Sequence, residues 1–148
     1  MQPTCARFCL VALTCATLAM SACARTRDSA PASAGCDAPR AQQLQAGGYR
    51  WLAQGQWYQA HLAAHALIAI GIACDQPVIA APATVHGDYI LAVVMHQRHD
   101  DRQSAYWLNS GEAVLQRVKQ HESDAPDLQG LYDEMQPKYL ALHDELPQ

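Results

Sequence analysis

Histidine is the residue type in this chain whose spacing most directly suggests chemistry. Of the seven histidines, His61 and His65 are four positions apart, so a helix would place both imidazoles on one face. Neutral imidazoles at that spacing can share a zinc or copper ion. Two more histidines and two aspartates form a second candidate cluster in the run HQRHDD at residues 96–101. The sequence places no third ligand beside His61 and His65, so the alternative is that they are half-buried or lie at an interface.

The sequence contains no motif of a known catalytic site. Gly-x-Ser-x-Gly, the phosphate-binding loop, His-Glu-x-x-His and the haem motif Cys-x-x-Cys-His are all missing. Two pairs of adjacent carboxylates, Asp133-Glu134 and Asp144-Glu145, could be considered for acid–base chemistry. Neighbours on a helix point in different directions, so neither pair faces one substrate. We therefore predict that the protein is not an enzyme and has no cofactor.

The six cysteines divide into groups with different fates. Residues 1–24 begin with a short segment containing Arg7, continue with an uncharged apolar run at 8–20 and end in small residues. This pattern predicts a secretory signal, because a membrane span needs about 20 strongly apolar residues. Three cysteines lie inside the predicted signal: Cys5, Cys9 and Cys15.

The end of the signal, Met20-Ser21-Ala22-Cys23, resembles the lipobox of bacterial lipoproteins. The resemblance implies cleavage after residue 22, a signal peptide at 1–22 and lipidation of Cys23, with palmitate among the expected acyl chains. Ala24 stands where an Asp would retain an enteric lipoprotein at the inner membrane, so the resemblance implies an outer-membrane anchor facing the periplasm. Residues 23–35 are small and polar and predict a flexible tether. The alternative is an ordinary signal cut after Ala22 or Ala24.

Cys36 and Cys74 are the two cysteines that remain in an oxidising compartment. Each is followed by Asp and, two residues later, by Pro, which marks a helix boundary or turn. Two antiparallel helices of similar length between them would bring the two sulfurs together, so we predict a disulfide. In the loop-entropy model it stabilises the domain by roughly 3.5–4 kcal/mol. The alternative is a redox or metal-binding thiol pair, although Cys-x-x-Cys spacing is absent.

The composition of residues 36–148 favours a single all-α domain of five to six helices. Half of the whole chain is hydrophobic, much of it Ala, and 7% is aromatic. Residues 51–74 contain no Asp, Glu, Lys or Arg. We interpret residues 42–74 as two antiparallel helices joined at Gly55-Gln56, and we expect the uncharged second helix to be covered on several sides by the rest of the chain.

The remaining helices are predicted from apolar spacing and boundary residues. Residues 77–82 are expected to be a connection, with Pro82 at the first position of a helix that continues to 97. A buried strand at 89–95 is the alternative, but it has no partner strand. Residues 101–120 fit either one helix or two that break at 109–111. A last helix should open at 123–126, and Pro137 should kink or split it.

The two predicted helices of the hairpin are similar in pattern to a tetratricopeptide repeat. The matching positions are Leu44, Gly47, Gly48, Trp51, Gly55, Trp57 and Ala60. The resemblance implies antiparallel hairpins packed as in that repeat, closed by an acidic C-terminal capping helix. It also implies a groove that binds a partner protein, and we expect Tyr49 to be exposed there and Trp51 to lie in the core. The groove positions are Gln42, Gln45, Tyr49, Leu52 and Asp88, with Thr84 and Leu91 as further candidates.

These expectations favour a non-catalytic protein-binding or scaffold lipoprotein with a periplasmic protein partner. Fourteen acidic residues against ten basic ones leave no basic footprint for nucleic acid. One alternative is an immunity or inhibitor lipoprotein that neutralises a cell-wall-degrading toxin. The other is a periplasmic metal-binding protein that uses His61 and His65.

Overall fold

The computed structural model describes residues 36–121 and 128–147, and it confirms the all-α prediction for them. They form five helices, and the described residues contain no strand. The expected signal, the tether and the start of the last helix at 123–126 lie outside these residues. The helices are α1 (Ala38–Ala53), α2 (Trp57–Ala73), α3 (Pro77–Gln97), α4 (Asp101–Gln120) and α5 (Gln129–Glu145).

Local sequence signals define the α1–α2 hairpin as expected. The Asp37 carboxylate accepts a hydrogen bond of 2.9 Å from the Arg40 amide and so caps the first turn of α1. Gly55 has a φ of +66°, which a residue without a side chain adopts without steric cost. The turn at Gly55-Gln56 is therefore confirmed, and Gly48 packs close to Ile90 and Ala63 on neighbouring helices.

The expected connection at 77–82 is wrong, because α3 already begins at Pro77. Pro77 occupies the first turn, where its missing N–H costs no helical hydrogen bond. Pro82 lies inside the helix and removes one backbone hydrogen bond. The residues that follow it, Ala83 and Val85, are fully buried, and this burial of α3 outweighs the lost bond.

The two later helices are each continuous. Residues 109–111 do not break α4, since Gly111 is buried there against the hydroxyl and ring of Tyr139 on α5. Pro137 does not split α5, which runs through it from Gln129 to Glu145. The described part of the chain thus has five helices, the lower of the two numbers that the sequence indicated. The packing of the hairpins as in tetratricopeptide repeats stays a prediction.

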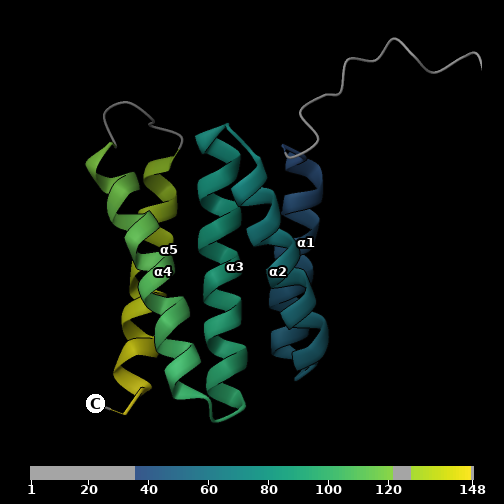
Figure 1. Ribbon diagram of the computed structural model, residues 1–148, viewed down its shortest axis with the longest axis vertical. Helices are drawn as coiled ribbons and strands as arrows, with labels where there is room; N and C mark the ends of the chain where they lie inside the picture. Colours follow the sequence, from purple (N-terminus) through teal and green to yellow (C-terminus); the bar gives the residue numbers. More distant parts are fainter. Residues whose placement is uncertain (1–35, 122–127, 148) are drawn as a thin grey trace, which may run out of the picture. The chain divides into compact units, whose positions relative to one another are not determined.

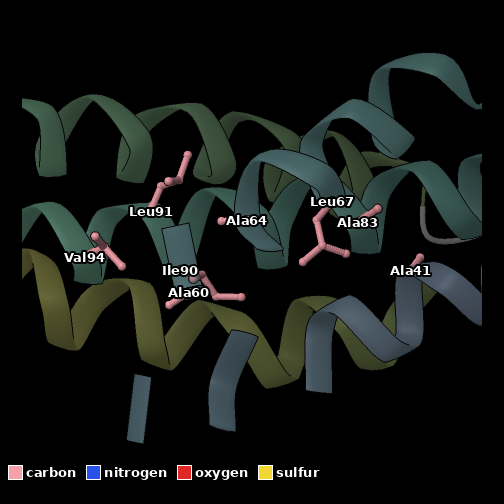
Figure 2. Packing of buried hydrophobic residues seen from close by; sticks show 8 residues of the cluster. All are labelled: Ala41, Ala60, Ala64, Leu67, Ala83, Ile90, Leu91 and Val94. Atoms are coloured by element: carbon pink, nitrogen blue, oxygen red, sulfur yellow. The ribbon is translucent and has the colours of Figure 1, made fainter. Parts of the chain in front are cut away.

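Helix α3 lies between the α1–α2 pair and the α4–α5 pair (Figure 1). Two buried clusters meet on it. The first joins α3 to α1 and α2, as Figure 2 shows for small alanines packed among Leu67, Ile90, Leu91 and Val94. The half-buried Trp51 packs against this cluster. The second joins α3 to α4 and α5 through Val85, Ala92, Leu108, Leu115, Leu131, Met135, Tyr139 and Leu142.

Among the described residues, α3 is also the one helix long and apolar enough to cross a membrane. Its most apolar stretch has a mean hydropathy of 1.6. Half of that stretch is buried within the domain, and α3 contributes to both core clusters. Its position among four other helices accounts for its composition.

Candidate functional site

The predicted bridge between Cys36 and Cys74 is confirmed. The two sulfurs are 2.04 Å apart and the two Cα atoms 4.7 Å apart, so the start of α1 is joined to the end of α2. The Asp75 carboxylate lies close to both sulfurs. Because disulfide sulfurs are not thiolates, this group of three does not supply the ligands that a soft metal ion needs.

Some of the predicted groove positions are exposed to solvent, and others are covered by neighbouring helices. On α1, Gln42 is exposed, and Gln45 and Leu52 are half-buried. On α3 the expectation of a groove-facing surface is wrong, because Asp88 and Leu91 are fully buried. The repeat resemblance had assigned these two residues to the groove, but neighbouring helices cover them. The third candidate on α3, Thr84, is half-buried, and its hydroxyl donates to the Ala80 carbonyl at 3.0 Å.

Tyr49 was expected to be exposed, and it is instead half-buried where α1, α3 and α5 meet. Its hydroxyl lies 2.9 Å from Nδ1 of His86 and 3.7 Å from the sulfur of Met135. The Lys138 ammonium lies 5.3 Å from the centre of its ring. Burial raises the pKa of Tyr49, with smaller contributions from Tyr89 and Glu134. Tyr49 therefore connects three helices and does not present a free side chain to a partner.

His86 is the buried basic partner in this contact. The pKa of His86 is lowered to about 4, mainly by burial; Glu134 opposes this change and Lys138 adds to it. The imidazole is therefore neutral at pH 7 and shares one hydrogen bond with the protonated Tyr49 hydroxyl. The exposed pair of Lys138 and Glu134, joined at 2.7 Å, lies over this contact on α5.

Asp88 carries the other buried ionisable group of α3. It is 1% exposed, and its Oδ2 has no hydrogen-bond partner among the described residues. Burial raises its pKa to about 6, while a hydrogen bond with the Ser110 side chain acts in the opposite direction. The Tyr139 hydroxyl of α5 donates a hydrogen bond of 2.7 Å to the Val85 carbonyl of α3. Asp88 is therefore a buried carboxyl between α3 and its neighbours.

The two candidate histidine clusters differ in geometry. The rings of His61 and His65 are 4.5 Å apart, and Nδ1 of His61 is buried without a hydrogen-bond partner in the described part. Burial, then His65 and Arg98, lower the pKa of His61, which favours the neutral form that binds metals. No third Cys, His, Asp or Glu ligand lies beside these two among residues 36–121 and 128–147.

The second cluster forms the α3–α4 turn. Nδ1 of His96 lies 3.0 Å from the Asp101 carboxylate, and its Nε2 lies 3.7 Å from Glu145. The Asp100 side chain accepts a hydrogen bond from the Gln103 amide and caps α4. His99 has a φ of +59° in the turn. These residues hold the turn and the helix end together, and no ligand set of three is formed by them in the described part.

An exposed apolar stripe on α2 was not expected. Tyr58, Leu62 and Ile72 are 69%, 51% and 80% exposed, and His65 and Ala69 between them are exposed as well. We call these five residues the α2 face. The expectation that other parts of the chain cover α2 on several sides is wrong on this side, for the described residues. Three of the six exposed large hydrophobic side chains among the described residues lie on α2.

The side of α2 opposite the stripe enters the core. Its buried residues are Ala60, Ala63, Ala64 and Leu67. At 100° per residue these point away from positions 58, 62, 65, 69 and 72. The spacing of the exposed set, alternately four and three residues, was the available signal. Absence of charge alone did not distinguish an apolar side chain that is buried from one that is exposed.

Aromatic residues extend the α2 face at its middle and at one end. The His65 ring lies edge-on to Trp107 of α4 at 6.1 Å, and Trp107 lies beside Tyr106, which is 60% exposed. At the start of α2, a shallow depression is lined by residues 55–59 and Arg98. The accessible surface here offers apolar and aromatic contacts to a partner.

Comparison with known proteins leaves this surface as the main guide to function. No protein-family model matches the chain, and no curated protein or solved structure matches it.

Proposed function

We propose that this protein is a non-catalytic protein-binding module held on the periplasmic side of the outer membrane by a lipid on Cys23. The observation that carries the binding function is the α2 face, an exposed apolar stripe on a helix without Asp, Glu, Lys or Arg. Exposed apolar patches of this kind commonly mark sites where another protein binds.

The α2 face suits a helical partner. Its residues follow one another at the four-and-three spacing with which two helices pack along a common seam. The opposite side of α2 is fixed in the core, and the disulfide holds the end of the helix. A rigid surface loses little conformational entropy when it binds, which favours association.

Support for the lipid anchor comes from the sequence Met20-Ser21-Ala22-Cys23 and its resemblance to a lipobox. Several acyl chains on one residue hold a protein at a membrane far more firmly than one chain does. Additional contacts with the partner are predicted at the groove positions of α1, which are Gln42, Gln45 and Leu52.

Affinity capture from detergent-solubilised cell envelope tests the binding function. The bait is the full chain, compared with the variants Leu62→Glu and Leu140→Glu. Leu62 and Leu140 are equally exposed, at 51% and 52%, but Leu140 lies on α5 outside the α2 face. We expect wild type and Leu140→Glu to retain the same protein and Leu62→Glu to lose it. Equal capture by all three baits, or capture of nothing, would refute the proposed function.

Metal binding is a second candidate, favoured by the contact of His61 with His65. Their rings are 4.5 Å apart, and a buried ring nitrogen of His61 has no protein partner in the described part. Two imidazoles are fewer than the three or four protein ligands of ordinary zinc sites. Titration of metal-free protein with Zn²⁺, compared with His65→Ala, tests this candidate, and identical titrations would exclude it.

A further inference from the structure

We infer that the partner of the α2 face is a second copy of this chain, packed antiparallel about His65. This inference rests on the proposed function, because it names the partner of the same surface. It follows from the order of large and small side chains along the stripe and from the distribution of charge.

The stripe is self-complementary when it is reversed. With His65 at the two-fold axis, Tyr58 of one copy lies opposite Ile72 of the other, and Leu62 lies within one residue, about 1.5 Å along the helix, of the position opposite Ala69. A small side chain thus faces a large one, and the same patch serves both copies, as a two-fold interface requires. In a parallel arrangement each large residue would meet its own copy, and the small Ala69 would meet Ala69.

Charge favours this surface over the other faces of the protein. Residues 36–148 contain thirteen acidic and seven basic side chains, so two copies repel where their acidic surfaces meet. The α2 helix contains no Asp, Glu, Lys or Arg, so the seam itself adds no like-charge repulsion. The uncharged stripe is therefore where two copies of an acidic protein approach most favourably.

The same absence of charge argues against a lipid surface as the occupant. Helices that lie in a membrane interface typically carry Lys or Arg on their polar face, which attracts anionic lipid. Helix α2 has none, and its side opposite the stripe is buried in the protein core. It has no polar side to present to lipid headgroups.

The interface is small, so the expected association is weak. Five residues of one helix and the neighbouring Tyr106 form a contact at the low end of the size range of specific interfaces. We expect a dissociation constant on the order of micromolar, and Leu62→Glu should weaken association at least about tenfold because two carboxylates enter the seam of each dimer.

Cysteine cross-linking in intact cells tests the partner and its direction together. In the proposed dimer, the two copies of residue 65 meet at the axis, so His65→Cys should form a disulfide-linked dimer upon mild oxidation. The copies of residue 58 lie about 21 Å apart along the helices, since each is seven residues from the axis. Tyr58→Cys should therefore give no dimer, and the unsubstituted chain controls for the other cysteines.

Each alternative outcome has its own meaning. Cross-linking of both variants would indicate a parallel pair, and an adduct of another mass would identify a different protein; either result overturns the inference. Sedimentation of the purified full chain in detergent gives an independent measurement, in which wild type and Leu140→Glu should associate with rising concentration and Leu62→Glu should not. A wild type that stays monomeric at about one hundred times the expected dissociation constant overturns the inference, while Leu62-dependent capture of another protein would leave the proposed function intact.

Discussion

At the residue scale, α3 contains two buried ionisable groups whose effects on stability have opposite pH dependence. The pKa of Asp88 is raised to about 6 in the folded protein, and that of His86 is lowered to about 4. Between these values the folded protein binds more protons at Asp88 than the unfolded chain does, and fewer at His86. Acidification from pH 7 to pH 4.5 therefore stabilises the fold through Asp88 and destabilises it through His86.

Single substitutions should separate the two effects. Asp88→Asn removes the stabilisation that acid supplies, so its melting temperature relative to wild type should be highest near pH 7 and fall as the pH falls. The melting temperature of His86→Asn relative to wild type should instead rise as the pH falls. Each pKa shift, over its full pH range, changes the free energy of unfolding by up to about 3 kcal/mol. Thermal unfolding at several pH values measures both, and pH-independent differences from wild type in the two variants would contradict the assignment.

The position of Asp88 shows what the sequence leaves open. The repeat resemblance assigned Asp88 to a groove-facing surface, and the sequence did not reveal that this residue is buried in contact with Ser110 of α4. Tyr49 was misplaced for the same reason, because its partner His86 is 37 positions away and Met135 is 86 positions away. Local patterns specify which side chains share a face, whereas long-range packing decides whether that face meets solvent.

At the scale of elements, the contact between α4 and α5 depends on Gly111. A Cβ atom there would overlap the Tyr139 hydroxyl and approach its ring carbons at 2.6 and 2.8 Å. We expect Gly111→Ala to destabilise the domain by about 1–3 kcal/mol, as overpacking does in other cores. Urea unfolding measures the change in the free energy of unfolding.

Gly130 provides the matched control for this substitution. It lies on the exposed side of α5, and a Cβ atom added there would contact nothing within 4 Å. Gly130→Ala should stabilise the domain by up to about 1 kcal/mol, because Ala favours helix more than Gly does. If both substitutions stabilise the protein equally, the proposed packing of Gly111 against Tyr139 is wrong.

The disulfide should contribute measurably to the stability of the helical hairpin. It joins residues 38 positions apart, and the loop-entropy model assigns such a bridge about 4 kcal/mol. Reduction should therefore lower the melting temperature by about 10 °C or more in a domain of this size. Differential scanning calorimetry with and without reductant measures the shift, and Cys36→Ser/Cys74→Ser should not respond to reductant.

The hairpin and its bridge were predictable because their signals are local. Asp37, the glycine of the turn and the two cysteines each indicate a boundary within a few residues. Pro82 was misinterpreted because its usual place is the first turn of a helix, while α3 is stabilised by burial against four helices. The α2 face was missed for a related reason: the uncharged sequence 51–74 is compatible with a helix buried all round and with one that presents an apolar side to a partner.

At the scale of the whole molecule, the proposed lipid anchor on Cys23 would determine where the α2 face is displayed. The lipobox resemblance predicts acylation of Cys23, so radiolabelled palmitate should enter the wild-type protein and not Cys23→Ser. The label is detected after electrophoresis of immunoprecipitated protein, and the substituted protein should leave the membrane fraction. Equal labelling of the two proteins would exclude the predicted site of acylation.

Zinc should strengthen the proposed dimer, because one chain supplies an incomplete ligand set. In the antiparallel register, His61 and His65 of both copies lie along the same edge of the helix pair. Zinc sites in proteins have three or four protein ligands, and the dimer adds His65 of the second copy, at the axis, to the two imidazoles of one chain. A metal that binds the dimer preferentially shifts association toward it by mass action.

Sedimentation at pH 7.5 with Zn²⁺ or with chelator measures this shift. His61→Gln is the control, since residue 61 lies beside the seam and its loss removes a ligand without changing the apolar contacts. We expect Zn²⁺ to lower the dissociation constant of the wild type by at least about tenfold, which equals about 1.4 kcal/mol, and to leave His61→Gln unchanged. Zinc that binds without altering association would instead place the metal within one chain, where the rings of His61 and His65 are 4.5 Å apart.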